Sequence, residues 1–303
     1  MSTFAGDVSA LTDEAVDQLR GKVGGAVLTA AESANGDVRA VYNAMHEGTP
    51  GVTVVASGTD DVAAAVKFAR EHGLLLAVRG GGHSVAGLST IEGGMLIDLA
   101  RMNAVEVDPE KKLAVAEGGA VWGDVDNATQ AHGLVAPGGV VSDTGIAGLT
   151  LGGGYGWVRR KLGLSCDSLI EAEVVTADGA VVTTSESENP DLFWALRGGG
   201  GNFGVVTSFT FKLHELGPDV AFSAVLYPLE DIRQVLEGWH EFMKTAPDEV
   251  TSVVITMTSW PLPSPMSTQP VEVLTKAASI VGGTPVTFPV LFNVAPPLVA
   301  IMQ

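Results

Sequence analysis

The chain has 303 residues, 46% of them hydrophobic, so it is long and apolar enough to build two domains with separate cores. Its formal net charge is −18, from 35 acidic and 17 basic residues, which argues against a nucleic-acid partner. The single cysteine, Cys166, excludes an internal disulfide and a cysteine-built zinc site, and no metal site is expected.

Hydrophobic periodicity and turn residues predict a mixture of helices and strands. In chain order these are helix 11–22, strand 52–56, helix 59–71, strands 74–78, 95–99, 104–108 and 113–116, helix 122–132, strands 170–176 and 180–183, helix 190–196, strands 205–212 and 221–226, helix 229–245 and strand 250–258. Thr12 and Thr59 are the predicted N-caps of the first two helices, and Gly73 follows the second. Asp178-Gly179 predicts the turn of a hairpin.

The segment Arg79-Gly80-Gly81-Gly82-His83-Ser84 follows an apolar run that predicts a buried strand. Three glycines remove every Cβ from the turn, so its backbone can take positive φ and its N–H groups can approach a ligand closely. Arg79, at the rim of this turn, would suit a diphosphate because a guanidinium pairs with phosphate oxygens. Taken alone, the segment is better explained by an ordinary glycine turn with a surface histidine.

Glycine recurs in clusters along the chain, which favours a long, flat, phosphorylated ligand that several loops approach closely. The clusters lie at 80–82, 93–94, 118–119, 138–139, 152–156 and 198–204. FAD is the natural candidate, and it gives His83 a role, since an imidazole can bond covalently to the methyl carbon of the flavin. The pattern Gly199-x-Gly201-x-x-Gly204 satisfies the dinucleotide fingerprint. It follows a predicted helix and opens a strand, however, so an NAD-binding Rossmann domain is disfavoured.

Four segments in this order resemble the berberine-bridge-enzyme-like flavoprotein oxidases, which share the fold of vanillyl-alcohol oxidase and p-cresol methylhydroxylase. The segments are residues 79–84, 142–154, 166–169 and 191–204. The resemblance implies an α+β fold, in which a p-cresol-methylhydroxylase-type FAD-binding domain of two α+β subdomains is followed by an incomplete antiparallel α+β substrate domain. The implied boundaries are an N-terminal lobe over 1–48, the FAD-binding domain over 49–217, and a partial substrate domain with a proline-rich apolar tail over 218–303.

The resemblance also implies which residues hold FAD. His83 would be linked to the flavin 8α-methyl group, and the segment from Arg79 to Ser84 would wrap the diphosphate. The implied cofactor-binding residues are Arg79, Gly80, Gly81, Gly82, His83, Ser84, Val141, Ser142, Gly145, Gly148, Gly204 and Val206. Members that attach FAD twice place a cysteine where this chain has Val141, so one bond through His83 is expected. Cys166 is expected to be a buried small hydrophobic side chain.

The implied reaction is an oxidation, in which hydride passes from an alcohol or amine C–H bond of a small-molecule substrate to covalently bound FAD and then to dioxygen. Family members continue well beyond 300 residues and carry the catalytic base there. No catalytic residue is therefore predicted, and this chain is expected to be a shortened form with weak turnover. The alternatives are a flavin-binding protein without turnover and an NAD-dependent dehydrogenase.

The last third of the chain is expected to leave apolar surface uncovered. Helix 229–245 would expose Val235, Trp239 and Phe242, which favours self-association. The stretch after Lys276 has no charged residue, but four prolines interrupt it, so a membrane span is disfavoured. The first residues form neither a basic nor an apolar leader segment, so a cytoplasmic location is expected.

Overall fold

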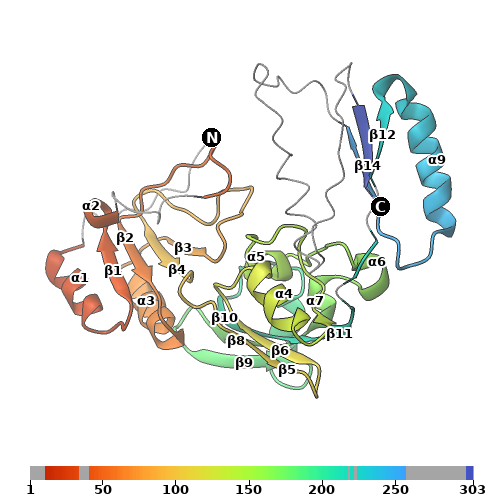
Figure 1. Cartoon of the computed structure of the whole chain (residues 1–303). Helices are drawn as coiled ribbons and strands as arrows, with labels where there is room; N and C mark the ends of the chain where they lie inside the picture. Colours follow the sequence, from red (N-terminus) through yellow and green to blue (C-terminus); the bar gives the residue numbers. More distant parts are fainter. Residues whose placement is uncertain (1–10, 34–40, 218, 222–223, 257–297, 303) are drawn as a thin grey trace. The chain divides into compact units, whose positions relative to one another are not determined.

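The structure is a computed structural model, and it describes residues 11–33, 41–217, 219–221, 224–256 and 298–302. The chain divides into two compact units. The first comprises residues 1–156 and 164–215, and the second comprises residues 157–163 and 216–303. The fold is α+β in both (Figure 1).

The first unit contains a mixed four-stranded sheet in the order β1 (Ala26–Thr29), β2 (Val52–Val55), β4 (Met95–Asp98) and β3 (Leu76–Arg79). β1 is antiparallel to β2, whereas β2 and β3 both run parallel to β4. Helix α3 (Thr59–Glu71) connects β2 to β3 and buries Val62, Val66 and Ala69, which completes the predicted β-α-β unit. Helices α1 (Asp13–Arg20) and α2 (Ala30–Ser33) flank β1.

The second sheet of this unit is antiparallel and has five strands (Figure 1). Its order is β5 (Val105–Asp108), β6 (Leu113–Glu117), β10 (Val205–Lys212), β8 (Leu169–Val175) and β9 (Val181–Ser185). The hairpins β5–β6 and β8–β9 are confirmed. The remaining elements of the unit are α4 (Trp122–Gln130), β7 (Leu134–Val135), α5 (Ile146–Leu151), α7 (Ser165–Ser168), α8 (Pro190–Leu196) and β11 (His214–Glu215).

Two apolar clusters hold the unit together. One gathers Val16, Leu19 and Val27 from the N-terminal elements with Val54 of β2 and the buried face of α3. The other packs Trp122 of α4 against the second sheet, where Phe209 and Phe211 are fully buried. Because the N-terminal residues share the first cluster, α1 and β1 are packed into this unit and have no separate core.

Two sequence expectations in this unit are wrong in detail. Gly58, not Thr59, occupies the N-cap of α3, and the Thr59 hydroxyl instead donates to Glu173 Oε1 at 2.6 Å. The strand predicted over 74–78 begins at Leu76 and is only partly buried, with Leu76 36% exposed. The reason is that β3 is the edge strand of its sheet, so one side lacks a neighbouring strand.

The second unit consists of α6 (Arg159–Leu162), β12 (Ala224–Pro228), the 3₁₀ turn η2 (Leu229–Asp231), α9 (Ile232–Thr245), β13 (Val253–Thr256) and β14 (Leu298–Met302). β14 was not predicted, and it pairs antiparallel with both β12 and β13. The predicted exposure of α9 is wrong for Val235, which is 8% exposed and packs with Trp239, whereas Phe242 is 41% exposed. Most of the charge-free tail lies outside the described residues.

A buried carboxylate joins the N-terminal segment to α3. Asp61, 5% exposed, accepts hydrogen bonds from the backbone N–H groups of Gly24 and Gly25 and from both the N–H and the hydroxyl of Ser57. Burial raises the pKa of Asp61, but these hydrogen bonds outweigh it and hold the pKa below its ordinary value. The charged form of Asp61 therefore stabilises the fold.

We predict that Asp61→Asn lowers the free energy of unfolding by about 1–3 kcal/mol at neutral pH, because the amide nitrogen cannot accept the lost hydrogen bonds. Because the pKa of Asp61 is lower in the folded protein, the carboxylate stabilises the fold at pH values above its pKa in the unfolded chain, about 3.9. That stabilisation is lost as the pH falls through the folded-state pKa. The free energy of unfolding, measured with urea between pH 7 and pH 3, should therefore change less with pH in the variant than in the wild type. Asp60→Asn, which changes the exposed neighbouring residue, is the control. An unchanged pH profile in Asp61→Asn would contradict this account.

Candidate functional site

The glycine turn after β3 lies directly against a second loop, residues 141–145. An added Cβ at Gly81 would be 2.2 Å from the backbone nitrogen of Gly145, and one at Gly145 would be 2.3 Å from the nitrogen of Gly81. Gly82 takes φ of +73°, which other residues rarely adopt. The two backbones therefore approach each other so closely that only glycine fits at either position.

The second loop is fixed by the start of α4. The N–H of Gly123 donates to the carbonyl of Ser142 at 2.8 Å, and the N–H of Trp122 donates to the carbonyl of Thr144 at 3.0 Å. In return, the N–H of Ile146 donates to the carbonyl of Ala120. Since Trp122 is fully buried in the core of the unit, the loop takes its position from that core.

The end of β10 closest to the turn is connected to it through Gly118. The N–H of Gly118 donates to the carbonyl of Thr207 at 2.9 Å, and an added Cβ at Gly118 would lie 2.4 Å from the carbonyl oxygen of Val206. A Cβ at Gly80 would in turn lie 3.2 Å from the Gly118 carbonyl oxygen. The structure thus brings Gly80, Gly81, Ser142, Gly145 and Val206, which are far apart in sequence, into one backbone cluster.

His83 leaves this cluster with its imidazole side chain 19% exposed. Its Nδ1 lies 3.3 Å from Thr144 Oγ1, and its Nε2 lies 3.4 Å from Asp143 Oδ1. A carboxylate accepts hydrogen bonds, so of the two neutral tautomers of His83, Asp143 favours the one with the proton on Nε2. The lone pair then lies on Nδ1, where it accepts from the Thr144 hydroxyl, and Nδ1 can act as a nucleophile when that hydroxyl turns away.

The backbone of the turn offers donors to an anion. Within the described part of the chain, no acceptor is found for the N–H groups of Gly80, Gly81, Gly82 and His83. Consecutive N–H groups without an internal partner form a concave anion-binding surface. The turn therefore fits the diphosphate of a dinucleotide.

Arg79 does not lie at the rim of the turn, contrary to the sequence expectation. Its residue is 7% exposed, and its guanidinium donates to the Asp98 carboxylate. The parallel register of β3 and β4 pairs Arg79 with Asp98 at the end of both strands. This buried ion pair anchors the point where the strand passes into the turn.

Three other predicted residues lie apart from this cluster. Ser84 accepts a hydrogen bond from the N–H of Leu88 at 3.0 Å. Gly148 is exposed on α5, and an added Cβ there would meet nothing within 4 Å. Gly204 takes φ of +146° and lies against the carbonyl of Val175, at the start of β10. Val141, in contrast, lies in the loop beside His83. It is 46% exposed, and its carbonyl accepts from the N–H of Thr144.

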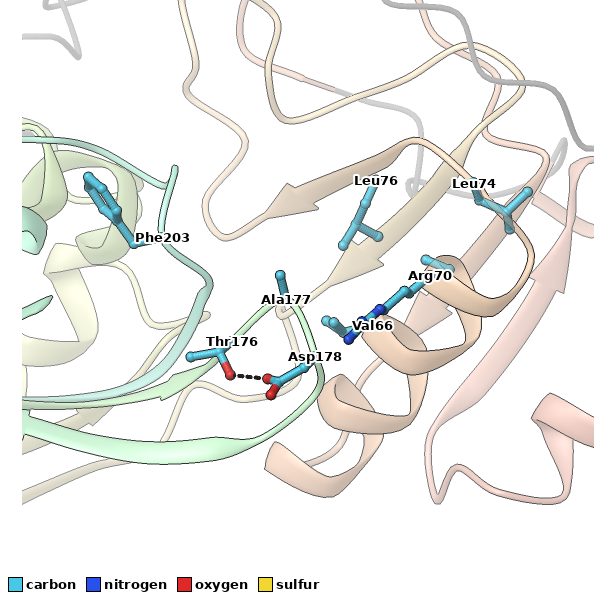
Figure 2. Close-up of a pocket in the computed structure, with 9 residues that line it drawn as sticks. Val66, Arg70, Leu74, Leu76, Thr176, Ala177, Asp178 and Phe203 are labelled. Atoms are coloured by element: carbon cyan, nitrogen blue, oxygen red, sulfur yellow. Dashed lines mark hydrogen bonds between the residues drawn. The ribbon is translucent and has the colours of Figure 1, made fainter.

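An open cavity of about 880 Å³ lies at the other end of β3 from the glycine turn. Figure 2 shows Leu76 at the start of β3, Val66 and Arg70 of α3, the Thr176–Asp178 hairpin turn, and Phe203 around it. The family resemblance implies that Gly204 and Val206 lie near the adenine end of FAD. Phe203 precedes Gly204, so this cavity adjoins that expected position. It is separate from His83 and carries no group for redox chemistry.

Sequence reasoning missed several residues of the site. Gly118 belonged to a glycine cluster, but nothing local showed that it would meet Val206. Asp143 and Thr144 belong to segment 142–154, which carries part of the family resemblance, but only the structure shows their side chains at the His83 imidazole. Among the described residues, no group of three or more His, Cys, Asp or Glu could bind a metal, and no helix is long and apolar enough to cross a membrane.

Two sheets, a close contact between glycine loops and a turn whose N–H groups lead to an oriented imidazole together fit a flavin nucleotide. Comparison with known proteins agrees: residues 50–185 match the family described as FAD binding domain. An uncharacterized FAD-linked oxidoreductase of Bacillus subtilis (strain 168) is 37% identical over 238 residues, covering 77% of this chain and 52% of the relative.

Solved structures similar to this chain include flavoprotein oxidases and a BBE-like protein. A Physcomitrella patens protein named BBE-like 1 superposes with a TM-score of 0.72 at 29% identity, covering 80% of this chain and 54% of that one. Glucooligosaccharide oxidase from Acremonium strictum, described with a 6-S-cysteinyl, 8α-N1-histidyl FAD, has a TM-score of 0.66 at 31% identity, covering 73% and 47%.

Residues 50–185 therefore match an FAD binding domain, the chain is similar to FAD-linked oxidoreductases over about half of their length, and the resemblance to the berberine-bridge-enzyme-like proteins is confirmed. The element order around Gly199, with α8 before the glycines and β10 after them, excludes a Rossmann fingerprint there. The chain spans about half the length of the curated relative described above.

We predict that Gly81→Ala separates the two loops, because the backbone of Gly145 cannot yield to a Cβ at 2.2 Å. The overpacking should cost about 1–3 kcal/mol of unfolding free energy. FAD content per folded protein, read from the flavin absorbance, should fall markedly. Gly58→Ala is the control, since a Cβ there meets nothing within 4 Å. Unchanged FAD content in Gly81→Ala would show that the contact is not needed for the site.

Proposed function

We propose that the protein is an FAD-dependent oxidase that takes hydride from an alcohol or amine C–H bond of a small molecule and passes the electrons to dioxygen. The observation that carries this proposal is the glycine turn, whose N–H groups have no acceptor among the described residues and lie beside an oriented imidazole. The redox chemistry is supplied by FAD when it is bound, and the protein's residues bind and orient it. The relatives' membership of the FAD-linked oxidoreductases supports the same reaction class.

The proposed division of labour follows from the position of each segment. The N–H groups of residues 80–83 would bind the diphosphate, and the buried Arg79–Asp98 pair would hold the turn in place. Val141, Ser142, Gly145 and Gly148 would run beside the ribityl chain and the flavin. Gly204 and Val206 would lie near the adenine, for which the neighbouring cavity beside Phe203 offers apolar space.

Within this proposal, His83 is bonded covalently to the flavin 8α-methyl carbon. The lone pair that Asp143 and Thr144 leave on Nδ1 supports it, and so does the histidyl FAD described for glucooligosaccharide oxidase. The bond through a second residue described for that oxidase has no counterpart here, because Val141 carries no sulfur. Cys166 is 5% exposed, and burial with the neighbouring Asp167 carboxylate raises the pKa of its thiol.

The proposed domain boundaries are the N-terminal lobe 1–48, the FAD-binding domain 49–217 and a partial substrate domain 218–303. A second candidate is a flavin-binding protein with little turnover. A hydrogen peroxide assay over a panel of alcohols, sugars and amines separates the oxidase from the flavin-binding protein with little turnover.

We also propose that the protein is cytoplasmic, in keeping with its single cysteine.

We predict that the purified protein precipitates yellow in acid, and that a flavin-bearing peptide contains His83. His83→Ala should still bind FAD through the backbone of the turn, but acid should release all of it to the supernatant. The ratio of flavin absorbance in pellet and supernatant measures this outcome. A colourless wild-type pellet, with all FAD in solution, would refute covalent attachment.

We further predict a single attachment. Cys166→Ala should leave the covalently bound flavin fraction unchanged, because a buried thiol with a raised pKa is a poor nucleophile. Mass spectrometry of the flavopeptide should show one histidyl bond and no cysteinyl adduct. A flavin adduct on the Cys166 peptide of the wild type that is absent from Cys166→Ala would show that the attachment has been misplaced.

A further inference from the structure

The imidazole of His83 has a third neighbour, which comes from outside the region matched by the family. The ring of Tyr42 stacks on the His83 ring with centroids 4.4 Å apart and an interplanar angle of 16°. The match to the FAD binding domain begins at residue 50. The stack therefore depends on a segment that neither the glycine motif nor the family region contains.

Hydrogen bonds fix this segment to the loop that follows the turn. The N–H of Tyr42 donates to the carbonyl of Gly82 at 3.0 Å, and Asn43 Nδ2 donates to the carbonyl of Val85 at 2.9 Å. His46 Nε2 lies 3.0 Å from that same carbonyl oxygen. The backbone of Tyr42 is thus tied to the residue immediately before His83, which places its ring beside the imidazole.

Together the three contacts restrict both side-chain torsions of His83. Thr144 and Asp143 contact the two nitrogens in the plane of the ring, and Tyr42 covers one face. The hydrogen bond to Thr144 at 3.3 Å and the Asp143 contact at 3.4 Å are both long, and they leave the ring free to tilt about the line between them. A parallel ring at stacking distance removes that tilt, so Tyr42 supplies the restraint that the other two residues lack.

We propose that Tyr42 is a positioning residue for covalent flavin attachment, holding the plane of the His83 imidazole in the orientation from which Nδ1, once the Thr144 hydroxyl turns away, attacks the flavin 8α-methyl carbon. This inference rests on the proposed function. In the step it serves, a bond forms between Nδ1 and the 8α carbon while one C–H bond of the methyl group breaks. The imidazole proton, the methyl proton and two electrons pass to dioxygen, which leaves as hydrogen peroxide. Orientation of the nucleophile is worth orders of magnitude in the rate of such a step.

The Tyr42 side chain is exposed, so the role of its ring can be tested by substitution. Tyr42 is 70% exposed, so its side chain adds little to the core and its removal should not unfold the protein. Tyr42→Phe keeps the ring and loses only the hydroxyl, whereas Tyr42→Ala loses the stack. Met45→Ala is the matched control, because Met45 is 76% exposed on the same segment.

The experiment has two readouts on the full chain. In the FAD-free protein, the His83 Hε1 proton, assigned with His83→Ala, is read by NMR, since a stacked aromatic ring moves it upfield. The same proteins are then mixed with FAD in air, and the covalently attached fraction is followed with time by acid precipitation. We expect wild type, Tyr42→Phe and Met45→Ala to share the upfield shift and the attachment rate. Tyr42→Ala should lose the shift and attach FAD at least about tenfold more slowly, with its non-covalent FAD binding retained.

The outcomes separate this inference from the proposed function. Attachment by Tyr42→Ala at the wild-type rate overturns the inference and leaves the proposed function standing. Slow attachment by Tyr42→Phe also overturns it, because the hydroxyl rather than the ring would then matter. A wild-type protein that shows the upfield shift yet binds no FAD overturns the proposed function and, with it, the role of the stack.

Discussion

The contact between the backbones of Gly81 and Gly145 is the constraint on which the rest of the site depends. It joins a turn that leaves an edge strand to a loop that the buried Trp122 holds in place. Side chains at either position would keep these segments apart, and His83 would then lose Thr144 and Asp143. The absence of a Cβ at both positions therefore lets the core-held loop support the turn. The N–H groups of the turn have no acceptor among the described residues and can meet a ligand.

Elements with strong local signals could be predicted from the sequence. Helix Pro190–Leu196 and strand Val205–Lys212 agree with their predicted bounds, because proline marks the first helical turn and clustered glycines separate the two elements. Strands Ala26–Thr29 and Leu298–Met302 could not be predicted, since pairing with distant strands defines them. The burial of Arg79 was missed for the same reason, as it depends on the register with a later strand.

The candidate site was predictable as a set of glycine loops but not as an arrangement of side chains. A motif gives the residue types that a close backbone approach requires, and from these the sequence predicts a place for a flat, phosphorylated ligand. The environment of the imidazole is assembled from residues 42, 143 and 144, which no spacing rule connects. Its orientation is a tertiary property, and so is the selection of one ring nitrogen as nucleophile.

The most direct test of the central claim is a crystal structure of the FAD-loaded protein. The account predicts that Gly81 and Gly145 keep their contact, that the diphosphate lies on the N–H groups of residues 80–83, and that electron density is continuous from His83 Nδ1 to the flavin. FAD bound elsewhere in the protein, or bound here with the two glycine backbones apart, would contradict it.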